Sequence, residues 1–386
     1  MKSSVQNVAE LKNNNRYMIL EKLRYKPLSR AELSLKTGLA KSSVTTLTNQ
    51  MIDEGLLLEV GLAEKSNKAG RTRILIGING DFGFVVGINL HRTKISLSAT
   101  DIGGRVLFEH FKPTNEFSNT SDAFEYIKSQ ISNEIKKAGL DAKNLLGIGV
   151  AAPGPLDCEK GIILTPPNFK LFNNFKIADE LKAVFGCPVS LENEALTLAL
   201  YEHYYVKPQT KNTLFVTVSN GIGGALIKNG EVYRGSHGIS GELGHISVNP
   251  NGEKCACGNR GCLEQYATLD ALKTRFGFRS YEDMVEGAEA GDEQSISAME
   301  FLINTLGTAF VCAVNLFDLD KIIISGEFAY KAECLTAKLE QYIKAHSVIC
   351  SMHSVEVLPS GQSGFTSHLA AAVPAINEFF KKSLNI

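Results

Sequence analysis

The chain has 386 residues, of which 44% are hydrophobic and 21% are charged, and its formal net charge is −1. This length is more than one hydrophobic core usually organises and favours two or three globular domains. The polar first fourteen residues lack the apolar stretch of a secretory signal, and no apolar run approaches the length of a membrane span. Eight cysteines without a disulfide framework are typical of a reducing compartment. We therefore expect a cytoplasmic protein with no membrane segment.

The charge is unevenly distributed along the chain. Residues 1–80 contain thirteen lysines and arginines against seven acidic residues, whereas the remainder is net acidic. A basic amino-terminal segment on an acidic body is typical of a nucleic-acid-binding module joined to a domain with another role.

The first 80 residues predict a small module of helices and strands. Ser29 and Glu32 have the spacing of a capping box, and Gly38 is placed to end the helix that they begin. The expected elements are helices over 15–26, 29–37 and 41–54 and strands over 56–60 and 72–78. This order predicts a winged helix-turn-helix, with a basic turn between the two strands.

The third predicted helix carries short polar side chains and one lysine on the face opposite its apolar residues. These residues are Lys41, Ser42, Ser43, Thr45, Thr46 and Asn49. Such side chains can reach base edges and phosphates in a major groove, so we predict that this helix binds operator DNA. The alternative is a small helical interaction domain with a polar exposed helix.

The body alternates strands and helices from Gly83 onward. Three strands, a helix and a further apolar strand are expected over 84–89, 95–101, 106–111, 121–138 and 146–151. A second set begins at Thr213. The spacing alone supports an α/β protein of unspecified topology.

Four metal-ligand side chains follow one another in a loop rich in glycine and asparagine. They are His245, Cys255, Cys257 and Cys262. Three thiolates and one imidazole suit tetrahedral Zn²⁺, and four protein ligands leave no open position for a catalytic water. Free thiols or a disulfide are the alternatives, but Cys255 and Cys257 are too close in sequence for an easy disulfide. We predict a structural zinc site.

The same loop carries a family resemblance. GELGH at 241–245, followed by CACGNRGCLE at 255–264, resembles the signature of the ROK family of bacterial sugar repressors and sugar kinases. The resemblance extends from about Asn15 to the end of the chain and implies a two-lobed, actin- and hexokinase-like body with nucleotide and sugar in the interlobe cleft. The implied domains are a winged helix-turn-helix over 1–80, a first lobe over 81–192 and 367–386, and a second lobe with the zinc loop over 193–366.

The resemblance also implies binding residues. Those expected to contact the hydroxyl groups of a sugar are Asn168, Asn193, Glu194, Glu242, His245 and Glu264. His245 would use one ring nitrogen for zinc and turn the other toward the sugar. Gly70 and Arg71 match an element that, in repressors of the family, reaches into an adjacent minor groove, where an arginine suits a narrow A/T-rich groove.

Several positions depart from the kinases of the family. Asn89 stands where the kinases have the aspartate that organises Mg²⁺, and His91 and Arg92 replace two glycines of a phosphate-binding hairpin. Glu194 replaces the catalytic aspartate with a carboxylate one methylene longer. The later glycine-rich loops, at 218–225 and 324–327, also depart from the kinase pattern.

These observations lead to one preferred function and two rivals. The preferred function is a cytoplasmic transcriptional repressor that binds a small sugar without phosphorylating it, and that acts as a homodimer or a dimer of dimers on paired DNA half-sites. The alternative is an ATP-dependent sugar kinase with a regulatory DNA-binding head. A third possibility is a zinc-stabilised module that responds to a protein partner.

Overall fold

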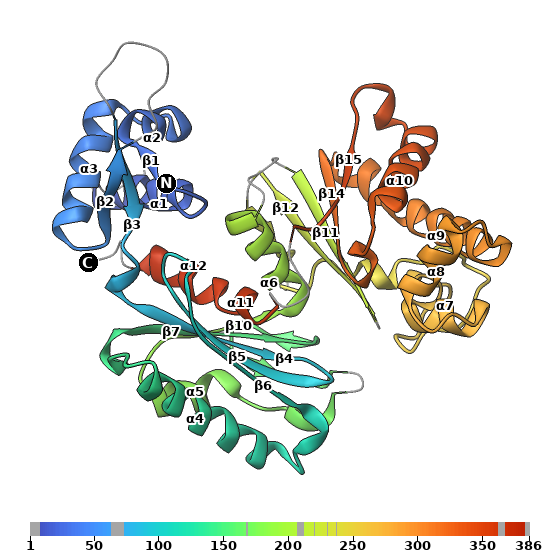
Figure 1. The fold of residues 1–386 in the computed structure, drawn as a ribbon, viewed down its shortest axis with the longest axis horizontal. Coiled ribbons are helices and arrows are strands. Elements are labelled where there is room, and N and C mark those ends of the chain that lie inside the picture. Colours follow the sequence, from blue (N-terminus) through green and yellow to red (C-terminus); the bar gives the residue numbers. More distant parts are fainter. Residues whose placement is uncertain are drawn as a thin grey trace, which may run out of the picture. The chain divides into compact units, whose positions relative to one another are not determined.

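The computed structural model describes residues 8–62, 73–166, 169–206, 212–219, 221–229, 231–236, 238–361 and 367–382. The chain divides into two compact units (Figure 1). The first consists of Met1–Pro208 with Thr366–Ile386, and the second of Gln209–Phe365. Each unit contains its own five-stranded sheet and hydrophobic core.

The amino-terminal part of the first unit contains three helices and a three-stranded antiparallel sheet. The elements are α1 (Val8–Leu23), β1 (Leu28–Ser29), α2 (Arg30–Thr37), α3 (Lys41–Asp53), β2 (Leu57–Leu62) and β3 (Ile74–Ile78). The predicted capping box is present, because the Ser29 side chain accepts from the Glu32 amide while Oε2 of Glu32 accepts from the Ser29 amide at 2.9 Å. Gly38 adopts φ 73° and ends α2, as predicted.

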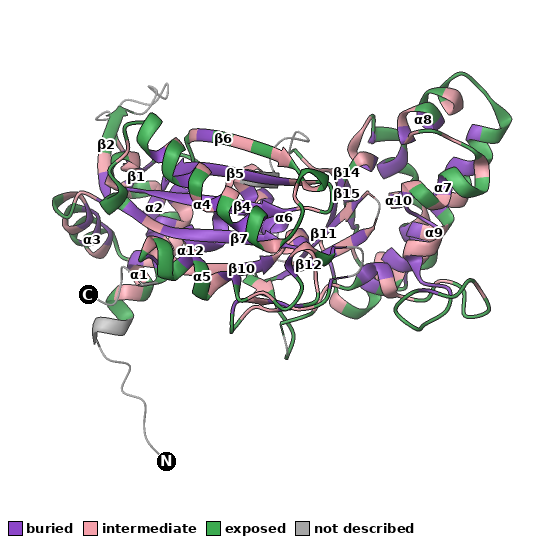
Figure 2. Ribbon diagram, turned by 90° about the horizontal axis from the view of Figure 1, so that it is seen from below, coloured by how far each residue is buried: buried purple, intermediate pink, exposed green. Residues whose placement is uncertain are grey.

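The three central strands of the first unit's sheet are almost completely buried, whereas its edge strands are partly exposed. Its strands are β4 (Phe84–Leu90), β5 (Lys94–Asp101), β6 (Val106–Pro113), β7 (Leu145–Ala152) and β10 (Val189–Asn193). The order is β10-β7-β4-β5-β6, with β4, β5 and β6 antiparallel and β7 and β10 parallel to their neighbours. Figure 2 shows β4, β5 and β7 largely in the colour of buried residues, as expected for a sheet covered on both faces.

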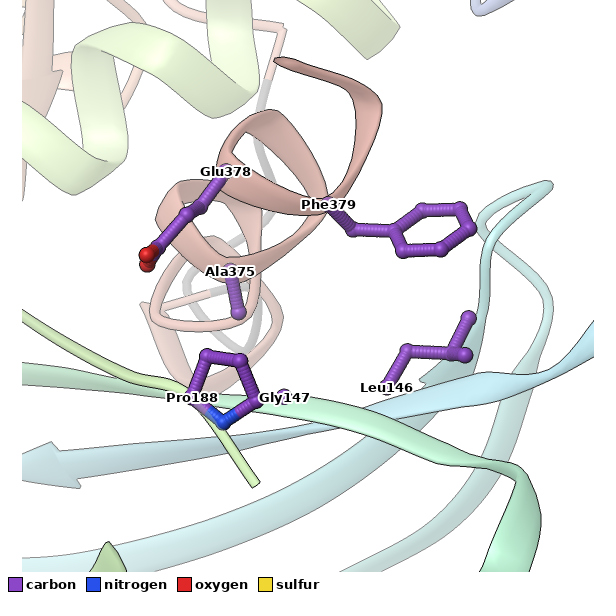
Figure 3. Close-up of a pocket in the computed structure, with 6 residues that line it drawn as sticks. All are labelled: Leu146, Gly147, Pro188, Ala375, Glu378 and Phe379. Atoms are coloured by element: carbon purple, nitrogen blue, oxygen red, sulfur yellow. The ribbon is translucent and has the colours of Figure 1, made fainter. Parts of the chain in front are cut away.

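Helices cover the two faces of this sheet. They are α4 (Thr120–Lys137), α5 (Ile177–Phe185), α6 (Glu194–Tyr201), α11 (Ser367–Ala370) and α12 (Val373–Lys382). Figure 1 shows α4 and α5 on one face and α11 and α12 on the other. The carboxyl-terminal segment thus returns to the first unit, as predicted. Between α12 and β7 lies a small cavity of about 60 Å³, lined mainly by apolar side chains such as Leu146, Ala375 and Phe379 (Figure 3).

The second unit repeats the strand order of the first. Its strands are β11 (Asn212–Val218), β12 (Ile222–Lys228), β13 (Glu231–Tyr233), β14 (Lys321–Gly326) and β15 (Glu356–Pro359). The order is β13-β12-β11-β14-β15, with an antiparallel meander followed by two parallel strands. The duplicated arrangement expected from the family resemblance is therefore present.

The helices of the second unit pack around one long central helix. They are α7 (Leu269–Phe276), α8 (Tyr281–Glu289), α9 (Glu293–Phe317) and α10 (Glu333–His346). Helix α9 has the length and composition of a membrane span, which differs from our expectation that no apolar run approaches that length. Leu302, Leu306 and Phe310 of α9 are fully buried in the core of this unit, so we interpret α9 as a core helix.

The boundary between the units differs from the one expected at residue 193. Helix α6 and the single π-helical turn η5 (Glu202–Val206) belong to the first unit, where α6 contacts α11, α12 and β7. Ala195, Leu198 and Ala199 are buried on α6, and this apolar face holds the helix in the first unit.

One hydrophobic cluster continues from the amino-terminal helices into the sheet of the first unit. Ile19 and Leu20 of α1 belong to the same buried cluster as Val85 of β4 and Ile376 and Phe380 of α12. The amino-terminal helices are therefore packed against the body of this unit.

Candidate functional site

The four predicted metal ligands lie together in the second unit. The ligand atoms of His245, Cys255, Cys257 and Cys262 are all within 4.8 Å of one another. Nδ1 of His245 lies 3.7 Å from Sγ of Cys255, and Sγ of Cys257 lies 3.6 Å from Sγ of Cys262. Metal–sulfur bonds of about 2.3 Å in a tetrahedron place two sulfurs roughly 3.8 Å apart. The cluster could therefore hold one four-coordinate metal ion.

Backbone contacts shape the loop that carries these ligands. The amide of Leu263 donates to the carbonyl of Ile246 at 2.9 Å, and the amide of Val248 donates to the carbonyl of Gly261 at 2.8 Å. Gly261 has φ 68°, and a Cβ atom there would overlap the carbonyl oxygen of Asn249. Only glycine allows the two arms of the loop to approach so closely.

The cysteines of the cluster differ in their affinity for protons. Burial, together with the neighbouring thiols of Cys257 and Cys255, raises the pKa of Cys262 to about 12. The backbone amide of Asn259 lowers the pKa of the exposed Cys257. Because a metal binds the thiolate, we expect metal binding to release protons from this loop.

Two acidic residues adjoin the metal ligands. Oε2 of Glu242 lies 4.0 Å from Nε2 of His245, so one ring nitrogen faces the cysteines and the other faces a carboxylate. Loss of hydration raises the pKa of Glu242, while the nearby His245 lowers it and the nearby Glu264 raises it. A carboxylate that accepts a hydrogen bond from the second nitrogen of a ligand histidine fixes the orientation of the ring. At 4.0 Å, Glu242 is close to His245 but beyond hydrogen-bond distance.

Asn193 and Glu194 lie in the first unit at the start of α6. Oδ1 of Asn193 accepts a hydrogen bond from the amide of Ala195 at 2.9 Å and caps the helix. Oε1 of Glu194 accepts from Nδ2 of Asn89 at 3.2 Å, and Asn89 is only 1% exposed. The sequence did not predict this contact, because the two positions lie 105 residues apart.

A histidine occupies the hairpin that precedes β5. Nδ1 of His91 lies 2.9 Å from Oγ1 of Thr93 and accepts from the Thr93 amide at 3.2 Å. The imidazole is therefore part of the turn itself. A phosphate approaching this hairpin would meet a fixed side chain where a glycine leaves the backbone open.

The glycine-rich turns of the second unit carry an acidic neighbour. Gly326 has φ 82°, and a Cβ atom there would overlap the carbonyl oxygen of Val218, so these two strand ends approach closely. Glu327 follows directly, and Oε2 of its carboxyl is buried without a hydrogen-bond partner among the described residues. Burial raises the pKa of Glu327, as do Glu282 and Asp270. Three acidic groups thus gather beside this turn.

The polar face of α3 is mostly open to solvent. Lys41, Ser42, Thr45, Thr46 and Asn49 are exposed and Ser43 is half-buried, while Val44, Leu47 and Met51 are buried. A residue that the sequence did not single out lies beside this face. Nη2 of Arg30 donates to Oδ1 of Asn49 at 2.7 Å, and Nε donates to Oγ1 of Thr48 at 3.1 Å. The sequence could not have predicted this contact, because an arginine at the first position of a helix is common and does not indicate a partner.

Three predicted binding residues lie outside the described residues. They are Asn168, Gly70 and Arg71.

Comparison with known proteins assigns the chain to a family. A model described as the ROK family matches residues 85–375. The chain belongs to the ROK family. A putative xylose repressor of Caldicellulosiruptor sp. (strain Rt8B.4) is 30% identical over 371 residues, covering 91% of this chain and 92% of the relative. An N-acetylglucosamine repressor of Escherichia coli O157:H7 is 30% identical over 341 residues, covering 84% of this chain and 83% of the relative.

Solved structures of the ROK family differ in how much of this chain they match. A ROK family transcriptional regulator, described as a homolog of the E. coli MLC protein, covers 97% of this chain and 98% of its own, with TM-score 0.78 and 25% identity. A ROK hexokinase from Thermus thermophilus covers 97% of its own chain but only 75% of this one, with TM-score 0.65 and 29% identity. About a quarter of this chain therefore has no counterpart in that hexokinase.

Proposed function

We propose that this ROK protein is a sugar-responsive transcriptional repressor of the cytoplasm that binds operator DNA and does not phosphorylate its sugar. The observation that carries the proposal is the difference in coverage. The transcriptional regulator matches nearly the whole chain, whereas the hexokinase leaves a quarter of it unmatched. The family model begins at residue 85, so the amino-terminal helices precede the part shared by the family.

The amino-terminal segment is proposed to be a winged helix-turn-helix, with α2 and α3 as the helix pair and β2 and β3 as the wing. Helix α3 would lie in the major groove with its exposed Lys41, Thr45 and Thr46 toward DNA. Arg30 steadies Asn49 at the edge of this face and is a further candidate for a phosphate contact. Gly70 and Arg71 remain candidates for the minor groove.

The sugar ligands are proposed to be Asn168, Asn193, Glu194, Glu242, His245 and Glu264. Carboxylate and amide groups suit a sugar because they exchange paired hydrogen bonds with neighbouring hydroxyl groups. The relatives named for xylose and N-acetylglucosamine suggest a pentose or an N-acetylhexosamine as the first effectors to test.

The proposed absence of phosphorylation is supported by four residues in three places. Asn89 donates a hydrogen bond to Glu194, so this pair contains only one carboxylate. A kinase needs two carboxylates here, one to hold the cation and one to accept the proton of the sugar hydroxyl. His91 fills the first hairpin. Glu327 and its acidic neighbours would repel a polyphosphate near the second unit's glycine-rich turns.

The metal is proposed to be a structural Zn²⁺ held by His245, Cys255, Cys257 and Cys262. The spacing of their ligand atoms suits tetrahedral zinc. When bound, zinc would fix the loop that carries Glu242 and Glu264, and it would leave no coordination position for a reacting water.

Helix α6 is proposed to connect the sugar residues with the DNA-binding segment. Glu194 lies in its first turn, and the η5 turn that continues it carries Tyr204. The Tyr204 ring lies 4.1 Å from the guanidinium carbon of Arg24, directly after α1. A shift of α6 on sugar binding would therefore reach the amino-terminal helices through residues in contact. In a homodimer or dimer of dimers, such shifts would change the spacing of the DNA-binding segments.

Selection of genomic DNA fragments on the purified full-length protein tests this proposal. The expected result is a small set of fragments that contain paired half-sites roughly one helical turn apart, or a multiple of it. Recovery of fragments without a shared sequence, combined with robust ADP release on a sugar, would favour the kinase with a regulatory head.

A further inference from the structure

A polar cavity lies where the amino-terminal helices of the first unit meet its body. Its volume is about 240 Å³. A water molecule occupies about 30 Å³ in the liquid, so the space suits a ligand of roughly eight waters. Arg24 and Tyr25 line it from the segment after α1, Thr100 and Gly104 from the region of the β5–β6 turn, and Tyr201 and Tyr205 from α6 and η5. None of these residues belongs to the proposed sugar or metal site.

Arg24 is a buried cation at the wall of this cavity. Its residue is 4% exposed, and its guanidinium lies 4.1 Å from the ring centroid of Tyr204 and 4.7 Å from that of Phe380. Nη1 donates to Oδ1 of Asn377 on α12. Among the described residues, Nε and Nη2 have no hydrogen-bond partner, and no carboxylate forms an ion pair with Arg24.

An unpaired guanidinium edge of this kind is costly to bury. Nε and Nη2 form the fork with which arginine binds a carboxylate or phosphate through two parallel hydrogen bonds. The two aromatic rings and the bond to Asn377 compensate part of the cost of burying Arg24. Among the described residues, however, Nε and Nη2 lose their hydration without gaining a hydrogen bond. A buried polar group without a partner in a native protein commonly marks the place of a bound ion or water.

Within the described ranges, two more buried polar atoms on the cavity residues lack hydrogen-bond partners. They are Oγ1 of Thr100 and the hydroxyl of Tyr205. Burial raises the pKa of Tyr205, so its hydroxyl stays protonated and available as a donor. Asp101, an acidic neighbour of Tyr205, already has partners of its own. It accepts from the amides of Gly103 and Arg105 at 2.9 Å and from Nε of Arg105 at 3.0 Å.

We propose that this cavity binds a small oxyanion, the phosphate or carboxylate group of a metabolite, through the free edge of Arg24 with the hydroxyls of Tyr205 and Thr100. The unpartnered atoms are shielded from solvent, so these side chains must turn toward the cavity as the anion enters. Arg24 follows α1 and contacts α12, so the anion would act on the packing between the amino-terminal helices and the body.

The test is a thermal-shift titration of the full-length protein with inorganic phosphate and, separately, with citrate. Ionic strength is held constant with potassium chloride, because general screening would otherwise mimic binding. The expected result is saturable stabilisation by at least one of the two anions, and the anion that acts identifies the group recognised. Arg24→Gln should weaken the apparent affinity by at least roughly tenfold, since a charged hydrogen-bond donor is lost.

Two smaller substitutions test the same proposal if Arg24→Gln fails to fold. Tyr205→Phe removes a hydroxyl and Thr100→Val replaces one with a methyl group, and neither hydroxyl has a hydrogen-bond partner in the part of the chain that the structure describes. The protein without anion should therefore be as stable as before or slightly more stable. Each should weaken anion binding by about two- to tenfold. Tyr126→Phe is the matched control, since Tyr126 also has a buried, unpartnered hydroxyl but lies on α4.

Two results would overturn the proposal. One is the lack of any saturable response of the unmodified protein to either anion. The other is an equal response of Tyr205→Phe, Thr100→Val and Tyr126→Phe, which would place the anion elsewhere. Sugar binding and operator binding are measured without added anion, so either result leaves the proposed repressor function untouched.

Discussion

Nδ2 of Asn89 donates a hydrogen bond to Oε1 of Glu194 at 3.2 Å and so joins β4 to the first turn of α6. Both residues stand where kinases of the ROK family are expected to carry aspartates. An amide and a carboxylate complement each other at this distance, whereas two carboxylates would repel without a cation between them. We therefore infer that the two expected departures from the kinase pattern act as a pair, because the amide of Asn89 gives the carboxylate of Glu194 a hydrogen-bond partner.

Replacement of Asn89 by Asp should destabilise the protein. Two carboxylates would then face each other in a buried place, with a cost of about 1–3 kcal/mol at neutral pH. Their repulsion raises the pKa of one of them, so the deficit should shrink as the pH falls below that raised pKa and the carboxyl becomes protonated. Urea unfolding at several pH values measures the effect.

The reversed pair is the control for this prediction. In Asn89→Asp combined with Glu194→Gln, the amide and carboxylate exchange places and the hydrogen bond can form again. We expect the double variant to recover most of the lost stability. If Asn89→Asp alone is as stable as the unmodified protein, the contact has no energetic importance.

Replacement of Cys257 by Ser should remove the metal. A hydroxyl is a poor zinc ligand, and three remaining ligands bind much more weakly than four. We expect zinc content to fall well below one ion per chain by elemental analysis, with a lower melting temperature. Cys312→Ser is the matched control, because Cys312 is an exposed cysteine outside the cluster. Full zinc content in Cys257→Ser would refute the assignment of this ligand.

Lys41 and Arg71 should affect DNA binding in different ways. Lys41→Ala should weaken binding evenly across sequences and reduce the salt dependence by about one unit, as expected for a phosphate contact. Arg71→Ala should instead relax a preference for A/T pairs beside each half-site. Lys338→Ala, an exposed lysine on α10 of the second unit, is the control and should change neither quantity. An unchanged flanking preference in Arg71→Ala would exclude the minor-groove role.

Restoring the catalytic aspartate alone should not create a kinase. Glu194→Asp supplies the expected base, but a phosphoryl donor must also be held in line with Mg²⁺ bridging its oxygens. Asn89 lacks the charge for that ion, and His91 remains within the hairpin. We therefore expect no measurable ADP release from Glu194→Asp with xylose, glucose or N-acetylglucosamine.

A variant with four substitutions tests whether the hairpin and the cation position, as well as the base, prevent phosphorylation. It combines Glu194→Asp and Asn89→Asp with His91→Gly and Arg92→Gly, and its activity is compared with that of the single variant. Turnover of Glu194→Asp alone in the range of kinases, about 1–100 per second, would mean that the phosphate-binding loops are intact.

Local signals in the sequence predicted many of the helices and strands. Most of the features that the sequence did not predict are contacts between residues far apart in the chain. The capping box at Ser29 and the left-handed Gly38 are local, so α2 could be placed from a few residues. The metal cluster was predictable because its four ligands lie within eighteen residues of one another.

Contacts between distant parts of the chain gave no such signal. The bond from Asn89 to Glu194 joins residues 105 apart, and the bond from Arg24 to Asn377 joins residues 353 apart. The assignment of α6 to the first unit depends on packing against α11 and α12, which composition does not reveal.

The most direct test of the central claim is the affinity of the full-length protein for its selected DNA fragment, measured by fluorescence anisotropy with and without xylose, glucose or N-acetylglucosamine. We predict that one sugar changes the dissociation constant by about 5- to 150-fold, the usual range of coupling between two sites, with no ADP formed when ATP is present. A dissociation constant that no sugar alters, together with steady turnover of ATP, would contradict the account and identify the protein as a sugar kinase.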